Sequence, residues 1–255
     1  MPYIVRGASR LYYEQHGEGD PVVLLHGVGG NHASWFHQVV AWRAKAQVIT
    51  VDARGFGNSE DVEQWGRSAF ADDLLALLDT LGLGRVSIVA QSMGGGTASS
   101  FVLRHPERVR SLVLADTLVG LALPDDLAAS MAEVAQRTQS LTQLQRVLGP
   151  TFTQAQPAQA YLYTALASFN ATNVRNLQGE QSLASAAQLS ATGVPILFVA
   201  GNEDVLFPSA YIHAFQRTLA GSAFIEIPGA GHSAYFEAPA AFNHQVYDWL
   251  DRQPA

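Results

Sequence analysis

The stretch VAQSMGGGTA, residues 89–98, places one serine, Ser92, between an apolar run and three consecutive glycines. The run before it, 86–90, is typical of a buried strand, and the run after it, 97–103, is typical of a helix. Small residues allow the sharp turn that has to join a strand to a helix. Such a turn is compatible with a purely structural serine. It is equally compatible with a serine that is held out to attack a substrate.

Strands and helices alternate along the chain on both sides of this turn. Apolar runs predict strands at 21–26, 47–52, 109–115, 194–200 and 224–227. Apolar residues at helical spacing predict helices at 31–42, 68–81, 208–219 and 239–251. Continuously apolar strands separated by helices indicate a mostly parallel sheet covered on both faces, so we expect an α/β fold.

The alternation stops at about residue 117 and resumes at about residue 191. Residues 118–190 contain no convincing strand, and their apolar spacing predicts helices at 128–148, 159–169 and 175–189. We therefore expect a core formed by 1–117 and 191–255, interrupted by a helical insert at 118–190 that is not an independent domain.

Composition excludes several classes of protein. The chain has 255 residues, no cysteine and a formal net charge of −7, with a single lysine. Disulfides, thiolate–zinc sites and a cysteine nucleophile are therefore ruled out. An acidic surface repels phosphate backbones, so nucleic acid is not an expected partner. No apolar stretch resembles a signal peptide or a membrane span, so we expect a cytoplasmic protein without a membrane partner.

If Ser92 is a nucleophile, it requires a base and a group that orients the base. His232 is the favoured base because it lies in the loop Gly-Ala-Gly-His-Ser, 229–233, between a strand and the last helix. Asp204 is the favoured acid because it directly follows the strand at 194–200. Asp116 also follows a strand and is its rival, and Glu203 is a weaker one.

An acyl transfer also needs N–H groups that stabilise an oxyanion. The loop His-Gly-Val-Gly-Gly, 26–30, follows an early strand, and we predict that the N–H groups of Val28 and Met93 form an oxyanion hole. Taken alone, the loop could be an ordinary glycine-rich turn. The order oxyanion loop, serine, acid, histidine, each after a strand, is the order of an α/β-hydrolase with a nucleophile elbow.

The sequence resembles the α/β-hydrolase family over essentially its whole length. The matching segments are His-Gly-Val-Gly at 26–29, Asp-Ala-Arg-Gly-Phe-Gly-Asn-Ser at 52–59, Gln-Ser-Met-Gly-Gly at 91–95, Gly-Asn-Glu-Asp at 201–204 and Gly-His at 231–232. The resemblance implies an eight-stranded sheet, a structural role for 52–59, and a helical cap over the active site at 118–190, after the sixth strand. One departure is Ala90, which replaces the first glycine of G-x-S-x-G.

Within the family, the chain looks most similar to the branch of small-ester hydrolases and 3-oxoadipate enol-lactonases. This implies a serine hydrolase for a small-molecule ester or lactone, with no metal and no organic cofactor. Hydrolysis of a carbon–carbon bond in an aromatic ring-cleavage product is one alternative, and a non-catalytic ligand receptor is another. The predicted substrate-binding residues are Trp35, Arg175, Phe207 and Tyr235, with Arg175 as the partner for a substrate carboxylate.

Overall fold

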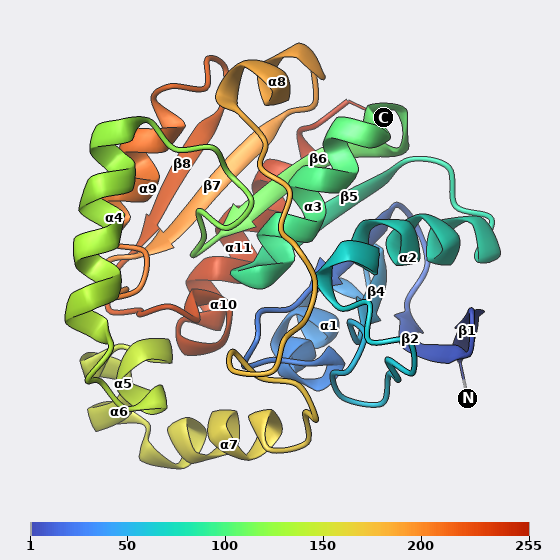
Figure 1. Cartoon of the computed structure of the whole chain (residues 1–255). Coiled ribbons are helices and arrows are strands. Elements are labelled where there is room, and N and C mark those ends of the chain that lie inside the picture. The colour runs from blue at the N-terminus through green and yellow to red at the C-terminus, as the bar shows by residue number, and fades with distance from the viewer. Residues whose placement is uncertain (1, 255) are drawn as a thin grey trace.

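A computed structural model describes residues 2–254 and is built on one eight-stranded sheet with helices on both faces (Figure 1). The strand order is β1-β2-β4-β3-β5-β6-β7-β8, and only the pairs β1–β2 and β2–β4 are antiparallel. This confirms the mostly parallel α/β fold. The strands are β1 (Tyr3–Arg6), β2 (Ser9–His16), β3 (Pro21–Leu25), β4 (Gln47–Val51), β5 (Val86–Gln91), β6 (Val109–Ala115), β7 (Ile196–Gly201) and β8 (Ala223–Ile227).

The apolar runs form strands because both of their faces are buried. Successive side chains of β3 pack into different core layers: Val23 and Leu25 into one, Val22 and Leu24 into the other. The α-helices that cover the two faces are α1 (Phe36–Trp42), α2 (Arg67–Thr80), α3 (Met93–Arg104), α9 (Ser209–Gln216), α10 (Ala234–Glu237) and α11 (Pro239–Asp251). Two short 3-10 helices accompany them, η1 (His32–Trp35) and η2 (Pro106–Arg108).

The insert at 118–190 contains five helices and differs in detail from the prediction. They are α4 (Asp125–Thr138), α5 (Gln143–Val147), α6 (Pro150–Ala155), α7 (Pro157–Ala167) and α8 (Ala186–Ala191). The single helix predicted at 128–148 is wrong, because the chain turns at 139–142 and Thr142 starts a new helix with a capping box.

The helix predicted at 175–189 is also wrong over most of its length. Only α8 is helical there, and residues 171–185 are irregular. Asparagine side chains hold this segment open: Asn176 Oδ1 accepts from the Asn173 N–H, and Asn173 Oδ1 accepts from the Arg175 N–H. Such local bonds compete with the helical pattern.

The insert leaves the sheet after β6 and returns to it before β7. In Figure 1, α4 to α7 lie on the side toward which the arrows of β6 and β7 point, and the segment that leads to α8 runs back across the front. The insert therefore lies near the carboxyl ends of the strands, where open parallel sheets place their ligand sites. Among residues 2–254, no helix is both long enough and apolar enough to cross a membrane.

Candidate active site

Ser92 lies in the tight turn between β5 and α3. Its φ of 49° is in the left-handed region, which is unusual for a residue other than glycine. The turn is held by the Ser92 N–H, which donates to the Ala115 carbonyl at 3.1 Å, and by the Gly95 N–H, which donates to the Ser92 carbonyl at 2.9 Å. A strained serine at a strand-to-helix turn is the geometry of a nucleophile elbow.

The elbow packs closely against the neighbouring strand. A Cβ atom at Gly94 would lie 2.5 Å from the Leu25 carbonyl oxygen, so a larger residue there would push α3 away from β3. Ala90, which replaces the first glycine of the family pattern, is fully buried at the end of β5. The alanine methyl group is accommodated, and Ser92 keeps its left-handed turn.

His232 lies between Ser92 and Asp204. Its Nε2 atom is 3.0 Å from Ser92 Oγ, and its Nδ1 atom is 2.9 Å from Asp204 Oδ2. The other oxygen of Asp204 accepts hydrogen bonds from the N–H groups of Leu206 and Phe207, at 2.8 and 3.0 Å. All three residues of the predicted triad are buried. The structure thus brings together a hydroxyl, an imidazole and a carboxylate that are distant in the sequence.

The two rival acids have other partners. Asp116 is fully buried, and it accepts from the Gly201 N–H at 2.7 Å and the Ala234 N–H at 3.0 Å. Burial, together with the nearby Asp204 carboxylate, raises the pKa of Asp116 well above its ordinary value. Glu203 binds the backbone N–H and the hydroxyl of Thr151 in the insert. Among the described residues, neither of these two carboxylates forms a hydrogen bond or an ion pair with His232, whereas Asp204 forms both.

The predicted oxyanion loop is shaped by buried hydrogen bonds. The His26 Nδ1–H donates to the Gly27 carbonyl at 2.7 Å, and Nε2 accepts from the Ala53 N–H at 3.0 Å, which fixes the neutral tautomer of the ring. Burial lowers the pKa of His26. Within residues 2–254, the N–H groups of Val28 and Met93 have no backbone or side-chain acceptor. Both are therefore free for a ligand oxygen.

Asn170, in the insert, ties this loop to its surroundings. Its Nδ2 donates to the Gly30 carbonyl at 3.0 Å, while its Oδ1 accepts from the Gly57 N–H at 3.0 Å and from Asn31 Nδ2 at 3.2 Å. Sequence reasoning missed this residue. Its only signal is an asparagine between helices, and that signal does not reveal contacts with loops more than a hundred positions away.

Glu237, also missed, holds the histidine loop. Its carboxylate accepts from the N–H groups of Gly231 and Ser233, on either side of His232, at 3.0 and 2.9 Å. It also accepts from the Gly149 N–H of the insert at 2.7 Å. Burial raises the pKa of Glu237 to about 7 even though these backbone bonds favour its charged form.

Two further contacts join the histidine loop to neighbouring segments. The Ser233 hydroxyl donates to the Tyr163 hydroxyl of α7 at 2.9 Å. Gln91, directly before Ser92, donates from Nε2 to the His232 carbonyl at 2.7 Å. The backbone of the histidine loop is therefore fixed from the elbow side and from the insert side.

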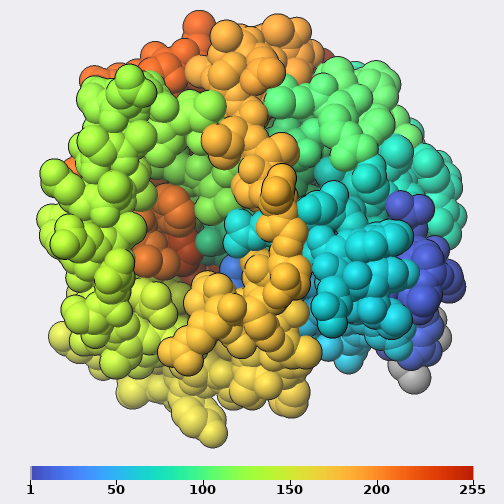
Figure 2. Space-filling view, in the orientation of Figure 1, coloured from blue at the N-terminus to red at the C-terminus, as the bar shows by residue number. Residues whose placement is uncertain are grey.

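A cavity of about 690 Å³ opens over Ser92 and His232, and Figure 2 shows a hollow between the yellow-green helices of the insert and its orange segment. Most of its other walls come from the insert, and the rest come from the loop at 26–30, Gln91 and Leu206. The lining residues are Val28, Gly29, Gln91, Ser92, Gln139, Leu141, Thr142, Gln143, Arg146, Val147, Tyr163, Thr164, Ala167, Ser168, Asn170, Thr172, Asn173, Val174, Arg175, Leu206 and His232. Among residues 2–254 there is no cluster of three or more histidine, aspartate or glutamate side chains that could hold a metal.

The four predicted substrate-binding residues have different positions. Arg175 lines the cavity. Phe207 stacks on the His232 ring with centroids 5.6 Å apart, so it supports the imidazole. Trp35 and Tyr235 are both 0% exposed and pack together with centroids 4.2 Å apart, outside the cavity. Their assignment to substrate binding is corrected: these rings pack against each other in the hydrophobic core.

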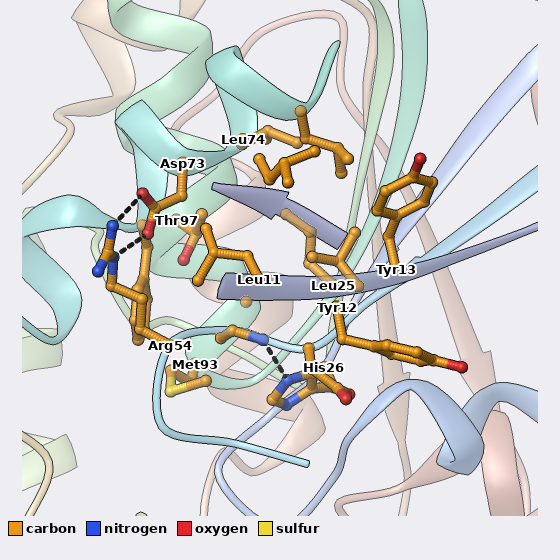
Figure 3. Close-up of a pocket in the computed structure, with 17 residues that line it drawn as sticks. Leu11, Tyr12, Tyr13, Leu25, His26, Arg54, Asp73, Leu74, Met93 and Thr97 are labelled. Carbon is orange, nitrogen blue, oxygen red and sulfur yellow. Dashed lines mark hydrogen bonds and ion pairs between the residues drawn. The ribbon is translucent and has the colours of Figure 1, made fainter. Parts of the chain in front are cut away.

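A second, smaller cavity of about 40 Å³ lies behind Met93 and is lined mostly by apolar side chains (Figure 3). At its edge the buried Arg54 guanidinium pairs with Asp73, with Nη2 and Oδ1 2.9 Å apart. Asp52 accepts from the N–H groups of His32 and Asn58, at 2.6 and 2.8 Å. These contacts give the 52–59 segment a structural role, as the resemblance to the α/β-hydrolase family implies.

Comparison with known proteins agrees with the observed fold. The family model for the α/β hydrolase fold matches residues 20–239. The chain belongs to the α/β-hydrolase fold family. Among curated members, RutD of Azorhizobium caulinodans, provisionally named a carbamate hydrolase, is 28% identical, with 96% of this chain and 97% of the relative covered. The similarity extends along both proteins from end to end.

Two other members of the α/β-hydrolase family are informative. The 2-hydroxy-6-oxononadienedioate/2-hydroxy-6-oxononatrienedioate hydrolase of Burkholderia vietnamiensis is 29% identical, with 95% of this chain and 91% of the relative covered. A thermophilic esterase from Thermogutta terrifontis superimposes with a TM-score of 0.81 and 26% identity, with 98% of each chain covered. This hydrolase family therefore includes members named for different scissile bonds.

Proposed function

We propose that this α/β-hydrolase is a serine hydrolase that cleaves a small ester or lactone through an acyl-enzyme. The observation that carries the proposal is the placement of His232 within hydrogen-bond distance of both Ser92 Oγ and Asp204 Oδ2, at 3.0 and 2.9 Å. A serine hydroxyl becomes a good nucleophile when a base takes its proton, and a carboxylate can hold the base in the required tautomer.

In the proposed first step, Ser92 Oγ attacks the carbonyl carbon while its proton passes to His232 Nε2. The oxygen of the tetrahedral intermediate accepts hydrogen bonds from the N–H groups of Val28 and Met93. His232 then gives the proton to the leaving alkoxide as the C–O bond breaks. Asp204 accepts the Nδ1–H throughout and stabilises the imidazolium.

In the second step, water attacks the acyl-enzyme carbonyl and gives a proton to His232. The bond from the acyl carbon to Ser92 Oγ breaks, and Ser92 recovers the proton. A lactone follows the same course, except that its alcohol remains attached to the released acid. The insert at 118–190 supports this chemistry as a cap, because it supplies most of the walls of the cavity over Ser92.

The proposal is tested by measuring hydrolysis of p-nitrophenyl butyrate near neutral pH, with the natural protein and with Ser92→Ala. We expect many turnovers per protein molecule with the natural sequence and none above background with Ser92→Ala. Equal rates for the two proteins would refute the proposal. A single burst of product without turnover would instead favour a ligand receptor on the same scaffold.

Carbon–carbon bond hydrolysis is a second candidate, supported by the similarity to the Burkholderia vietnamiensis enzyme named for 2-hydroxy-6-oxononadienedioate. Measuring the hydrolysis rate of that compound beside the rates for esters and lactones separates the two reactions. If kcat/KM for the dienedioate exceeds kcat/KM for every ester and lactone tested, carbon–carbon bond hydrolysis is the function and ester hydrolysis is not.

A further inference from the structure

The charges that line the cavity over Ser92 are of one sign. Arg146 and Arg175 contribute two guanidinium groups, and none of the described residues that line it is an aspartate or a glutamate. This contrasts with the whole chain, whose formal net charge is −7. A cationic cavity in an acidic protein favours an anionic ligand over a neutral one.

The two arginines come from separate parts of the insert. Arg146 lies in α5 and is half-buried, whereas Arg175 lies in the irregular segment 171–185 and is exposed. Both approach the same cavity as Ser92 and His232. An anion held by either guanidinium would therefore lie in the space that a substrate of Ser92 occupies.

Neither guanidinium is neutralised within the protein. Over residues 2–254, no carboxylate lies within ion-pair distance of Arg146 or Arg175, and neither side chain has a hydrogen-bond partner. Other arginines of the chain do have carboxylate partners: Arg6, Arg10, Arg54, Arg104, Arg108 and Arg110. An unpaired guanidinium in a cavity gains from a partner that arrives with the ligand, and the half-buried Arg146 gains more than the exposed Arg175.

The rest of the lining mixes polar and apolar side chains. Amide and hydroxyl groups come from Gln139, Thr142, Gln143, Thr164, Ser168, Asn170, Thr172 and Asn173, and apolar groups come from Val28, Leu141, Val147, Ala167, Val174 and Leu206. Ligand pockets are usually lined by apolar side chains with only a few polar groups. The larger polar share here suits a substrate with several hydrogen-bonding groups.

We infer that the substrate carries a carboxylate in addition to its scissile carbonyl, and that Arg146 and Arg175 bind this carboxylate. The substrate class is then the half-ester of a dicarboxylic acid, or a lactone with a carboxylate-bearing arm. Guanidinium groups match a carboxylate because their paired N–H groups donate to both of its oxygens. The inference rests on the proposed function for the scissile bond, but the anion site can be tested separately.

Two matched series of esters test the inference. One series contains the monomethyl esters of succinate, glutarate, adipate and pimelate, and the other contains the methyl esters of the monocarboxylic acids of equal chain length. We expect kcat/KM for the best half-ester to exceed that of its neutral counterpart by about tenfold or more, through a lower KM. High salt should reduce the preference because it screens partly exposed charges.

Arginine variants identify the source of the preference. Arg146→Gln and Arg175→Gln should each reduce the ratio between the two series by about tenfold, the effect of one charge-assisted hydrogen bond. Arg137→Gln is the matched control, because Arg137 is an exposed arginine of α4 that does not line the cavity. Its ratio should equal that of the natural protein.

The outcomes separate this inference from the proposed function. Hydrolysis of neutral esters that depends on Ser92 but shows no preference for half-esters would overturn the carboxylate site and leave the serine hydrolase intact. If no ester is hydrolysed, calorimetric titration of adipate into Ser92→Ala decides the matter. Binding that is lost in both arginine variants supports the site, and absence of binding overturns it.

Discussion

A Cβ atom added to Gly27 would lie 2.9 Å from the Cβ atom of Ser92. It would also lie 2.2 Å from Oε1 of Gln91, the residue before Ser92. Real Cβ atoms do not approach other atoms this closely, so the predicted oxyanion loop can touch the turn at Ser92 only because residue 27 has no side chain. The relation explains why a glycine follows His26 directly at the end of β3.

Gly27→Ala should therefore reduce activity by moving the oxyanion loop away from Ser92. We expect kcat to fall about a hundredfold, similar to the loss of one oxyanion donor. Gly84→Ala is the control, because a Cβ at Gly84 would meet no heavy atom within 4 Å. Equal kcat values for the two variants on p-nitrophenyl butyrate would contradict the assigned contact.

We predict that the Asp204 carboxylate orients the His232 ring and that the Asp116 carboxylate does not. Asp204→Asn should lower kcat by about 10⁴, because an amide at this position does not hold the required tautomer. Asp116→Asn should keep kcat within about tenfold of the natural protein and reduce stability by about 1–3 kcal/mol, because one of its two N–H donors loses an acceptor. Steady-state kinetics and urea unfolding measure the two effects. A larger kcat loss in Asp116→Asn would reverse the assignment.

Glu237 should make stability depend on pH. Its pKa rises from 4.5 to about 7 on folding, so the folded protein binds the extra proton over this interval. The stabilisation is complete below the unfolded pKa and is lost as the pH rises through the folded pKa. The free energy of unfolding should therefore fall by roughly 2 kcal/mol between about pH 5 and about pH 8 on account of this group.

Glu237→Gln should lack that decrease, because its amide does not titrate. The comparison is best made as the difference in unfolding free energy between the natural protein and the variant, since titratable groups far from Glu237 contribute equally to both and cancel in it. Glu133→Gln, at an exposed position of α4, should follow the natural protein at every pH. Parallel curves for the natural protein and Glu237→Gln would show that the carboxyl does not titrate in this range.

Asn170 should act on turnover through the oxyanion loop. Asn170→Ala removes the hydrogen bonds to Gly30, Gly57 and Asn31. We expect kcat to fall by about tenfold or more, with a stability loss of about 1–3 kcal/mol. Gln143→Ala is the control, since Gln143 lines the same cavity and has no side-chain hydrogen bond within residues 2–254. A change confined to KM would assign Asn170 to substrate contact instead.

The parallel part of the sheet and the meeting of Ser92, Asp204 and His232 are predictable from the sequence because their signals are local. Most of the parallel strands are apolar runs, as at 86–90, because both of their faces are buried, whereas the antiparallel β1 and β2 contain polar residues and are not predicted. Ser92, Asp204 and His232 each follow such a strand at the carboxyl edge of the sheet. Their meeting follows from the parallel arrangement of strands and does not depend on details of packing.

The insert and the supporting contacts are not predictable in this way. The apolar spacing at 175–189 suggests a helix, but hydrogen bonds of Asn173 and Asn176 keep the segment irregular. Trp35 and Tyr235 lie beside motif residues in the sequence and yet pack against each other in the core. The contacts of Glu237 with Gly149 and Asn170 with Gly30 join distant segments through backbone groups, which leave no sequence pattern.

The most direct test of the central claim is mass spectrometry of the intact protein, quenched with acid during turnover of p-nitrophenyl butyrate. The account predicts that a fraction of the protein gains the mass of one butyryl group, that peptide mapping places this group on Ser92, and that Ser92→Ala gains nothing. An acyl group on another residue, or turnover in Ser92→Ala at the natural rate, would contradict the account.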